Sequence, residues 1–190
     1  MRILFLVVVF VLSGCASTTK QLDLGYILNQ DEFKGTKRYS IPSPGSLDGE
    51  GAFSLSRAYV DIFTDVKEDK IATSLAIILH FESWVFINKG ESLVLKVDDE
   101  LIKFTSPSGS RYNRDLLKGV AAIGGGSIYE EAHYPITVEQ IKQLAYAKKV
   151  EVRVYGSKGY VTREFNSDYF ESIKAYYEKF ILKNGIHTVS

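Results

Sequence analysis

The sequence predicts an α+β fold, made mainly of an antiparallel β-sheet or sandwich, with two helices in the C-terminal part. Two observations support this prediction. Between residues 57 and 136 the hydrophobic pattern consists of alternating or short apolar runs separated by turn residues, which is typical of neighbouring strands. Helical periodicity with start signals follows only after residue 136. Strands that come first and helices that come late indicate helices packed on one face or end of an antiparallel sheet.

The first strands are predicted from residue 57 onward. The stretch "RAYVDIFTDV" (57–66) alternates between two faces, and "IATSLAIILHFE" (71–82) is apolar enough to be buried on both of its faces. Three shorter candidates follow, separated by the turn residues "KG" and "DDE": "WVFIN" (84–88), "ESLVLKV" (91–97) and "LIKFTS" (101–106). Because the connections are short, consecutive strands are expected to form an antiparallel meander.

The second half of the chain is predicted to contain three more strands. "SPSGSRYNRD" (106–115) is expected to be a loop, "GVAAIGGG" (119–126) a flexible connection and "SIYEEAHYPI" (127–136) a strand. "KVEVRVYG" (149–156) and "YVTREF" (160–165) then read as a hairpin around "GSKG".

Both predicted helices have clear start signals. Thr137 is placed as the N-cap of the first helix, with Gln140 at the spacing of a capping box, and that helix is expected to extend to about residue 147. The second helix lies within "FNSDYFESIKAYYEKFILKNG" (165–185), where Asn166 is the expected N-cap and Gly185 a fitting C-terminal stop.

The N-terminus has the composition of a secretory signal. Arg2 is the only charge before Lys20, and "ILFLVVVFVL" (3–12) is an unbroken apolar run of ten residues. Ten helical residues reach about 15 Å, roughly half of a ~30 Å hydrocarbon core, so this run is too short for a permanent transmembrane helix. A basic residue, a short apolar block and then small residues form the pattern of a signal peptide.

The four residues "LSGC" (Leu12, Ser13, Gly14, Cys15) follow directly. They resemble the lipobox of bacterial lipoproteins, which has a branched apolar residue, two small residues and a cysteine. The resemblance covers residues 1–15 alone and matches all four lipobox positions. It implies signal-peptidase recognition of Leu12, Ser13 and Gly14, transfer of a diacylglyceryl group to the Cys15 sulfur, and cleavage before Cys15. Two acyl chains anchor a protein stably in a bilayer.

The chain is therefore expected to comprise a lipoprotein signal peptide (1–14), a lipidated tether (15–23), an irregular lead-in (24–56) and one globular α+β domain (57–190). The lipid anchor places the protein in the cell envelope. Ala16 follows the cysteine, and by analogy with Gram-negative lipoproteins this favours the outer membrane. In a Gram-positive cell the same signal implies the outer face of the single membrane. The residues do not distinguish the Gram type or the leaflet.

Composition narrows the expected partners and cofactors. Removal of residues 1–14 takes away one basic residue, which leaves 22 basic residues (23 − 1) against 23 acidic ones. A nucleic-acid partner is not expected, since it normally requires a basic excess or stripe. The chain has a single cysteine, so lipidation of Cys15 leaves no thiol for a disulfide, a metal site or a nucleophile. No spacing resembles a calcium loop. We expect no metal, and no cofactor beyond the covalent lipid on Cys15.

Three histidines are the main candidates for chemistry in the folded part. His80 lies in the most apolar strand and is expected to be a hydrogen-bonded core residue, whereas His187 is close to the C-terminus. In "YEEAHY" strand alternation places Tyr129, Glu131 and His133 on one face. A carboxylate and an imidazole at this spacing, Glu131 and His133, could together serve as general base and orienter. Pairing with neighbouring strands on a solvent-exposed face explains the same trio equally well.

These observations favour a non-catalytic, lipid-anchored envelope lipoprotein that binds or scaffolds another envelope component. One alternative is an envelope hydrolase that uses Glu131 and His133, and it requires these side chains to meet in a concave pocket with a third polar group; side chains that lie apart or on a flat face would exclude it. The other is a small-ligand or peptide carrier with an apolar cavity lined by strand residues. The sequence does not specify the partner, the ligand or the oligomeric state.

Overall fold

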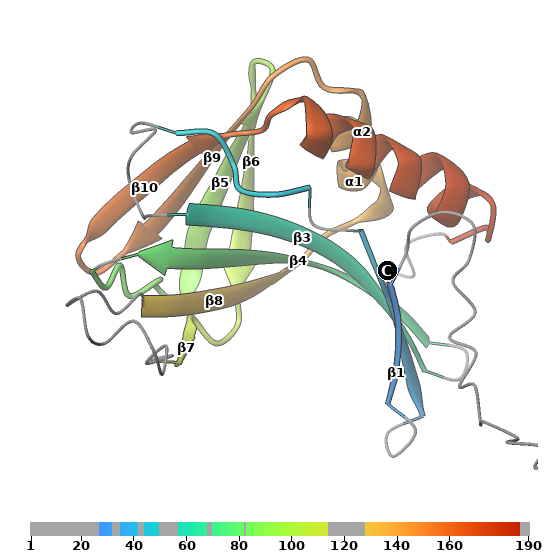
Figure 1. Ribbon diagram of the computed structural model, residues 1–190, viewed down its shortest axis with the longest axis horizontal. Coiled ribbons are helices and arrows are strands. Elements are labelled where there is room, and N and C mark those ends of the chain that lie inside the picture. Colours follow the sequence, from blue (N-terminus) through green and yellow to red (C-terminus); the bar gives the residue numbers. More distant parts are fainter. Residues whose placement is uncertain are drawn as a thin grey trace, which may run out of the picture.

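A computed structural model describes residues 27–31, 35–41, 44–49, 57–67, 70–81, 83–113 and 128–186. In these residues the chain forms strands, two α-helices and a short π-helical segment (Figure 1). In chain order the elements are β1 (Ile27–Asp31), β2 (Thr36–Ser40), β3 (Arg57–Lys67), β4 (Lys70–Phe81), β5 (Gly90–Val97), β6 (Glu100–Ser106), β7 (Arg111–Asn113), β8 (Ile128–Pro135), α1 (Val138–Tyr146), β9 (Val150–Gly156), β10 (Gly159–Glu164), α2 (Ser167–Tyr176) and the π-helical segment η2 (Tyr177–Leu182).

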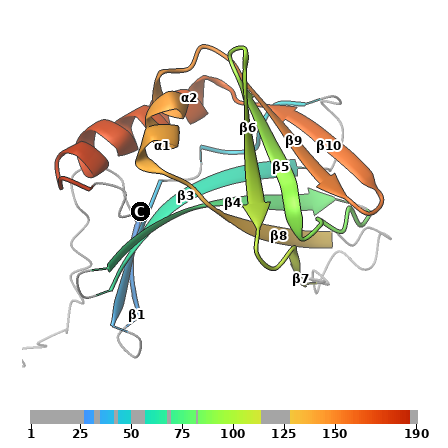
Figure 2. The same cartoon turned by 180° about the vertical axis from the view of Figure 1, so that it is seen from behind.

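The strands form two antiparallel sheets. The large sheet has the order β1-β2-β3-β4-β8-β7 and the small sheet the order β10-β9-β5-β6. The small sheet and both helices cover one face of the large sheet, and the strands of the small sheet run across those of the large one (Figures 1 and 2). In the part of the chain that the structure describes, no strand or helix lies over the opposite face, which we call the open face. The predicted α+β class, with both helices near the C-terminus, is confirmed.

One core fills the space between the layers. Along β3 every second residue from Ala58 to Thr64 is buried, as expected for a strand with one face in the core. The inward residues of both sheets and of the helices join a single cluster. Its fully buried members include Ile62, Leu75, Ile77, Leu93, Leu95, Ala132, Tyr134, Ile141, Leu144, Val150, Tyr169, Ile173, Tyr176 and Ile181.

Residues before position 57 belong to this fold. The irregular lead-in expected for residues 24–56 contains strands β1 and β2 instead. β2 pairs with only the second half of β3, and other groups bond to the backbone of the first half. The Leu47 amide donates to Ala58 O (2.7 Å), and the Val60 amide donates to the Tyr169 hydroxyl (3.1 Å). A backbone edge buried without such partners is costly, and this explains why the segment is held against β3.

Capping interactions mark the starts of both helices and the end of the second. Thr137 and Gln140 form the predicted capping box reciprocally, through side-chain bonds to each other's backbone amides. The Asn166 side chain accepts the Tyr169 amide at the start of α2. α2 continues into η2, and Gly185 ends the segment with φ +60°, a conformation that favours glycine.

The segment 84–88 differs from its prediction as a strand: apart from one isolated bridge at Ile87 it has no strand structure. Its amides point instead at Glu130, a core-facing residue of β8 that is 1% exposed. The Val85 and Phe86 amides donate to Glu130 Oε1 (2.6 and 3.0 Å), and the Ile87 amide donates to Oε2 (3.1 Å). We call these contacts the Glu130 clamp. Its hydrogen bonds are nonlocal, so a local pattern could not reveal them.

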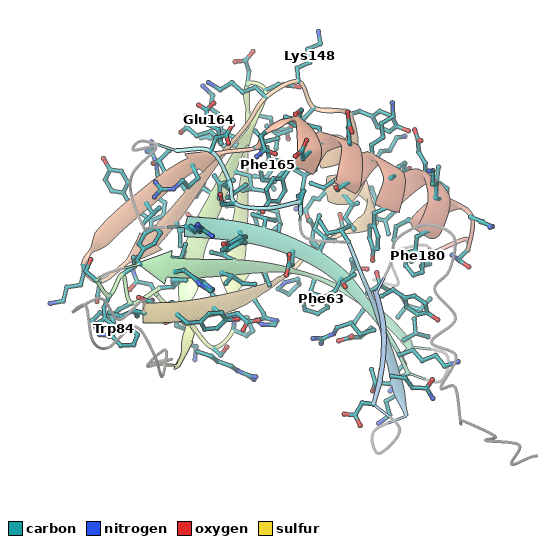
Figure 3. The ribbon with its side chains drawn as sticks, viewed as in Figure 1. Phe63, Trp84, Lys148, Glu164, Phe165 and Phe180 are labelled. Atoms are coloured by element: carbon teal, nitrogen blue, oxygen red, sulfur yellow. The ribbon has the colours of Figure 1, made fainter. Side chains whose placement is uncertain are left out.

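The clamp is reinforced by the β9–β10 hairpin. Val85 O accepts the Lys158 amide (3.3 Å) and Phe86 O accepts the Ser157 amide (3.0 Å). Phe86 adopts φ +53°, a strained conformation for a bulky residue, and its ring stacks on Trp84 at 5.2 Å. Trp84 lies at the end of the molecule away from Phe180 (Figure 3).

The predicted antiparallel meander is confirmed only in part. β3 pairs with β4 and β5 pairs with β6, as expected for consecutive strands. β5, however, lies in the small sheet, and β8 takes its place beside β4. Residues 111–113, predicted as loop, form the short strand β7, which pairs with β8. The predicted connection 119–126 lies outside the described residues. No helix among those residues is long and apolar enough to span a membrane.

Candidate functional site

Strand register assembles the candidate site on the open face of the large sheet. Odd-numbered residues of β3 and even-numbered residues of β4 point to this face, and so do odd-numbered residues of β8. Tyr59 lies opposite Ile78, which in turn lies opposite Glu131; one step along, Asp61, Ala76 and His133 form the next row. The consecutive strands β3 and β4 and the more distant strand β8 therefore bring their polar residues into adjacent rows.

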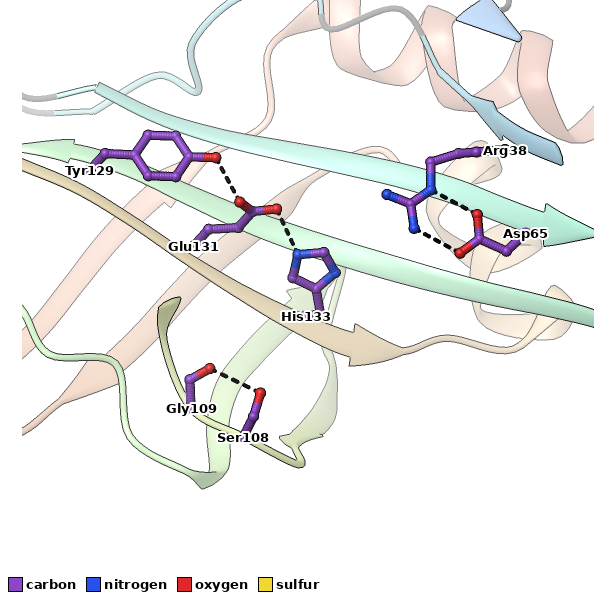
Figure 4. Close-up of polar contacts among 7 residues, drawn as sticks. All are labelled: Arg38, Asp65, Ser108, Gly109, Tyr129, Glu131 and His133. Carbon is purple, nitrogen blue, oxygen red and sulfur yellow. Dashed lines mark hydrogen bonds and ion pairs between the residues drawn. The ribbon is translucent and has the colours of Figure 1, made fainter. Parts of the chain in front are cut away.

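On β8, Glu131 lies between Tyr129 and His133 (Figure 4). Its Oε1 is 2.6 Å from His133 Nε2, and its Oε2 accepts the Tyr129 hydroxyl at 2.7 Å. The side chains of His133 and Glu131 are 34% and 26% exposed. Hydrogen bonds from His133 and Tyr129 hold the pKa of Glu131 below its usual range, against the opposing effect of burial. Burial, together with the bond to Glu131, raises the pKa of Tyr129.

Asp61 provides a second carboxyl group on the face. Burial raises its pKa above the usual range, and the nearby charge of Glu131 raises it further. Asp61 Oδ1 is buried and has no hydrogen-bond partner among the described residues. The two carboxyl groups thus have pKa values shifted in opposite directions by their surroundings.

A third carboxyl group, Asp65, is paired with arginine. Arg38 binds Asp65 with both prongs of its guanidinium, through Nε–Oδ1 and Nη2–Oδ2 contacts of 2.7 Å each (Figure 4). The guanidinium also lies over the Phe63 ring, 4.1 Å from its centroid. Phe63 in turn meets the edge of His133, with ring centroids 5.5 Å apart.

Aromatic contacts continue in the other direction along the sheet. The Tyr129 ring lies 5.1 Å from His80, and His80 lies 5.5 Å from Tyr59, both in edge-to-face geometry. His80 was expected in the core, and this is wrong. It faces outward: the outer face of β4 is only partly covered at Ile78 and His80, whereas the inner-facing residues from Leu75 to Phe81 are buried.

These contacts form one continuous series of side chains, which we call the open-face network. In the order of their contacts, its members are Asp65, Arg38, Phe63, His133, Glu131, Tyr129, His80 and Tyr59.

Sequence reasoning found part of this site. Glu131 and His133 do meet, as the predicted trio with Tyr129 requires, and Tyr129 supplies the third polar group. They lie on the open face of the large sheet, and the concave pocket that the hydrolase alternative requires stays a prediction. Alternation alone could not add Arg38, Phe63 or the other members, because their strands join the site only through register. Cys15, Leu12, Ser13, Gly14 and His187 lie outside the described residues.

The acidic residues of the turn "DDE" have a structural role. Asp98 and Asp99 form the turn between β5 and β6, as expected. Asp98 Oδ1 accepts the amides of Lys148 and Lys149 at 3.0 and 2.9 Å, and this ties the turn to the start of β9. Among the described residues, no group of three or more histidine, cysteine, aspartate or glutamate side chains is arranged to hold a metal ion.

Comparison of the chain with known protein families, curated proteins and solved structures found no match.

Proposed function

We propose that this protein is a lipid-anchored bacterial envelope lipoprotein whose folded domain binds or scaffolds another envelope component through the open face of its large sheet. The anchor is supported by the apolar run 3–12 and by the lipobox-like residues that end at Cys15. The binding role is supported by the open-face network. The carrier alternative stays a prediction; the inward side chains of both sheets pack in a single buried cluster.

The observation that carries the binding role is the composition of the open-face network. It combines tyrosine, phenylalanine and arginine, which are enriched where proteins meet partners. The polar members hold one another in place through short hydrogen bonds around Glu131. Side chains that are already ordered lose less entropy when a partner binds. A partly exposed and pre-ordered surface of this kind suits recognition.

The anchoring part is tested by Cys15→Ala, with Ser17→Ala as the matched control. Mass spectrometry of the purified protein is expected to find a wild-type chain that begins at residue 15 and carries a diacylglyceryl group. The Ser17→Ala chain is expected to carry the same group, and the Cys15→Ala chain to lack it. A bare thiol at residue 15, or a leader still attached in mature wild-type protein, contradicts the anchor.

The binding part is tested by crosslinking in intact cells. A photo-reactive residue in place of Tyr59 reports on the open face, and the same residue in place of Tyr160 is the control. Tyr160 is 64% exposed and lies on β10 of the small sheet. We expect one defined envelope species to be captured from position 59 but not from position 160. Equal capture from both positions, or capture from position 160 alone, contradicts the assignment of the open face.

A second candidate is an envelope hydrolase, favoured by the 2.6 Å contact between Glu131 and His133. In this hypothesis Glu131 orients the imidazole and His133 acts as general base. The hypothesis predicts turnover of an ester, peptide or glycosidic substrate that is lost in both Glu131→Gln and His133→Gln. Turnover that survives both substitutions excludes this site.

A further inference from the structure

Acidic and basic side chains are mixed on the open face. By strand register, four carboxyl groups share the face with five basic residues: Asp31, Asp61, Asp65 and Glu131 with Arg38, Arg57, Lys67, Lys70 and Arg111. Arg38 is paired with Asp65, Arg57 lies opposite His80, and Arg111 lies opposite Glu131. Interfaces are complementary in charge to their partners, so a face of mixed sign suits a neutral ligand better than a polyanion or a polycation.

The ligand must also match the aromatic rings and the hydrogen-bonding groups that lie among the charged residues. Tyr59, His80 and Tyr129 present half-buried rings, which can stack on an apolar surface. Arg57 and Arg111 are exposed donors at the rim, and among the described residues Glu131 accepts hydrogen bonds at only two of its lone-pair positions. The partner should therefore have apolar faces, and it should also carry groups that both donate and accept hydrogen bonds.

Sugar rings meet both requirements without net charge. Their C–H faces stack on aromatic rings, and each hydroxyl can donate to a carboxylate and accept from a guanidinium. The rows on β3, β4 and β8 repeat such groups along the strands, which suits an extended chain of sugar units. We propose that the open-face network binds a neutral carbohydrate chain of the cell envelope. The proposal rests on the binding role argued above and names its ligand class.

The test uses the full-length mature protein, purified from membranes in a detergent without a sugar headgroup, because such headgroups would compete. Calorimetric titration with chitohexaose, cellohexaose and maltohexaose probes neutral sugars. Oligolysine and oligoglutamate probe the charged alternatives. The variants are Tyr59→Ala and Glu131→Gln, with Tyr160→Ala as the matched control on the small sheet. Far-UV circular dichroism and urea unfolding establish that each variant is folded.

We expect wild type to bind at least one hexaose at micromolar to millimolar concentration, with affinity reduced roughly tenfold or more in Tyr59→Ala, as for other aromatic contacts at binding surfaces. Tyr160→Ala should bind like wild type. The proposal is overturned if no hexaose binds, if a charged oligomer binds instead, or if Tyr160→Ala loses as much affinity as Tyr59→Ala. Specific capture of a protein from position 59 without any sugar binding would overturn this inference while the proposed binding role stands.

Discussion

Glu130 and Glu131 are neighbours in the sequence but belong to two different regions of the molecule. Glu130 points into the core, is 1% exposed and accepts three backbone amides of residues 85–87. Glu131 points to the open face, where its 26%-exposed side chain is hydrogen-bonded to the side chains of Tyr129 and His133. The two-residue period of a strand sends identical groups to opposite surroundings.

The surroundings of each carboxyl group determine whether it contributes mainly to stability or to binding. A buried acceptor that serves several amides supports the fold, because its loss leaves those donors without partners in the core. An acceptor at a wet surface can be replaced at low cost, since water takes over its bonds. We therefore expect substitutions on the core face to act on stability and those on the open face to act mainly on binding.

The largest effect is expected for Glu130→Ala. Removal of the carboxyl group leaves the amides of Val85, Phe86 and Ile87 without their acceptor, which should lower the free energy of unfolding by about 3–5 kcal/mol. Urea unfolding followed by far-UV circular dichroism measures this loss. Trp84, the only tryptophan of the chain, adjoins the clamp, so its fluorescence reports whether the segment loosens first.

Glu131→Ala is the matched control for this experiment, since it removes the same group one residue along the strand. Its loss of stability should be several-fold smaller. Glu130→Gln keeps one acceptor oxygen and should lie between Glu130→Ala and wild type. Equal destabilisation by Glu130→Ala and Glu131→Ala would break the distinction between the two faces of β8.

A second substitution tests the other side of the clamp. A Cβ atom at Gly156 would lie 2.1 Å from Val85 O and 2.8 Å from Phe86 O, so the segment has to move. Overpacking of this kind should cost Gly156→Ala about 2–3 kcal/mol in urea unfolding. Ser157→Ala is the control, because the bond from Ser157 to Phe86 O uses the backbone amide and survives. A Gly156→Ala protein as stable as Ser157→Ala would mean that the hairpin does not support the clamp.

These two regions also show what the sequence could predict. Period-two alternation located β3 and the shared face of Tyr129, Glu131 and His133 on β8, and a long apolar run located β4. Capping chemistry located the starts of both helices. These signals are all local. Segment 84–88 was wrongly predicted as a strand. Its composition suits a strand, but its amides bond to Glu130, more than forty residues away.

The candidate site was predictable only within one strand. Tyr129, Glu131 and His133 share the face of β8 by alternation, and they meet as predicted. Residues from other strands join through register, which depends on how strands distant in the sequence pair. His80 was misassigned for a related reason: an apolar strand does not reveal which of its faces a second layer covers.

A smaller effect is expected on the open face, for Glu131→Gln. The pKa of Glu131 is lowered in the folded state, so its stabilising contribution is present above its unfolded pKa and is lost as the pH falls through the folded pKa. Discounted for solvent screening, the loss at neutral pH should be about 1 kcal/mol or less. Urea unfolding over a pH series should show the difference between variant and wild type disappearing in acid. A constant difference would contradict the assigned cause.

The smallest effect is expected for Asp61→Asn, and its sign is opposite. The pKa of Asp61 is raised, so the stability linked to its protonation is present below its unfolded pKa and is lost as the pH rises through the folded pKa. Removing the charge should stabilise the protein at neutral pH by roughly 0.5–1 kcal/mol, with the gain vanishing in acid. The same pH series measures it. Residues that serve function often lower the stability of the fold. An Asp61→Asn protein that is more stable than wild type but binds its ligand more weakly would therefore assign Asp61 to binding, in contrast to Glu130, which supports the fold. An Asp61→Asn protein less stable than wild type at neutral pH would instead make Asp61 part of the scaffold.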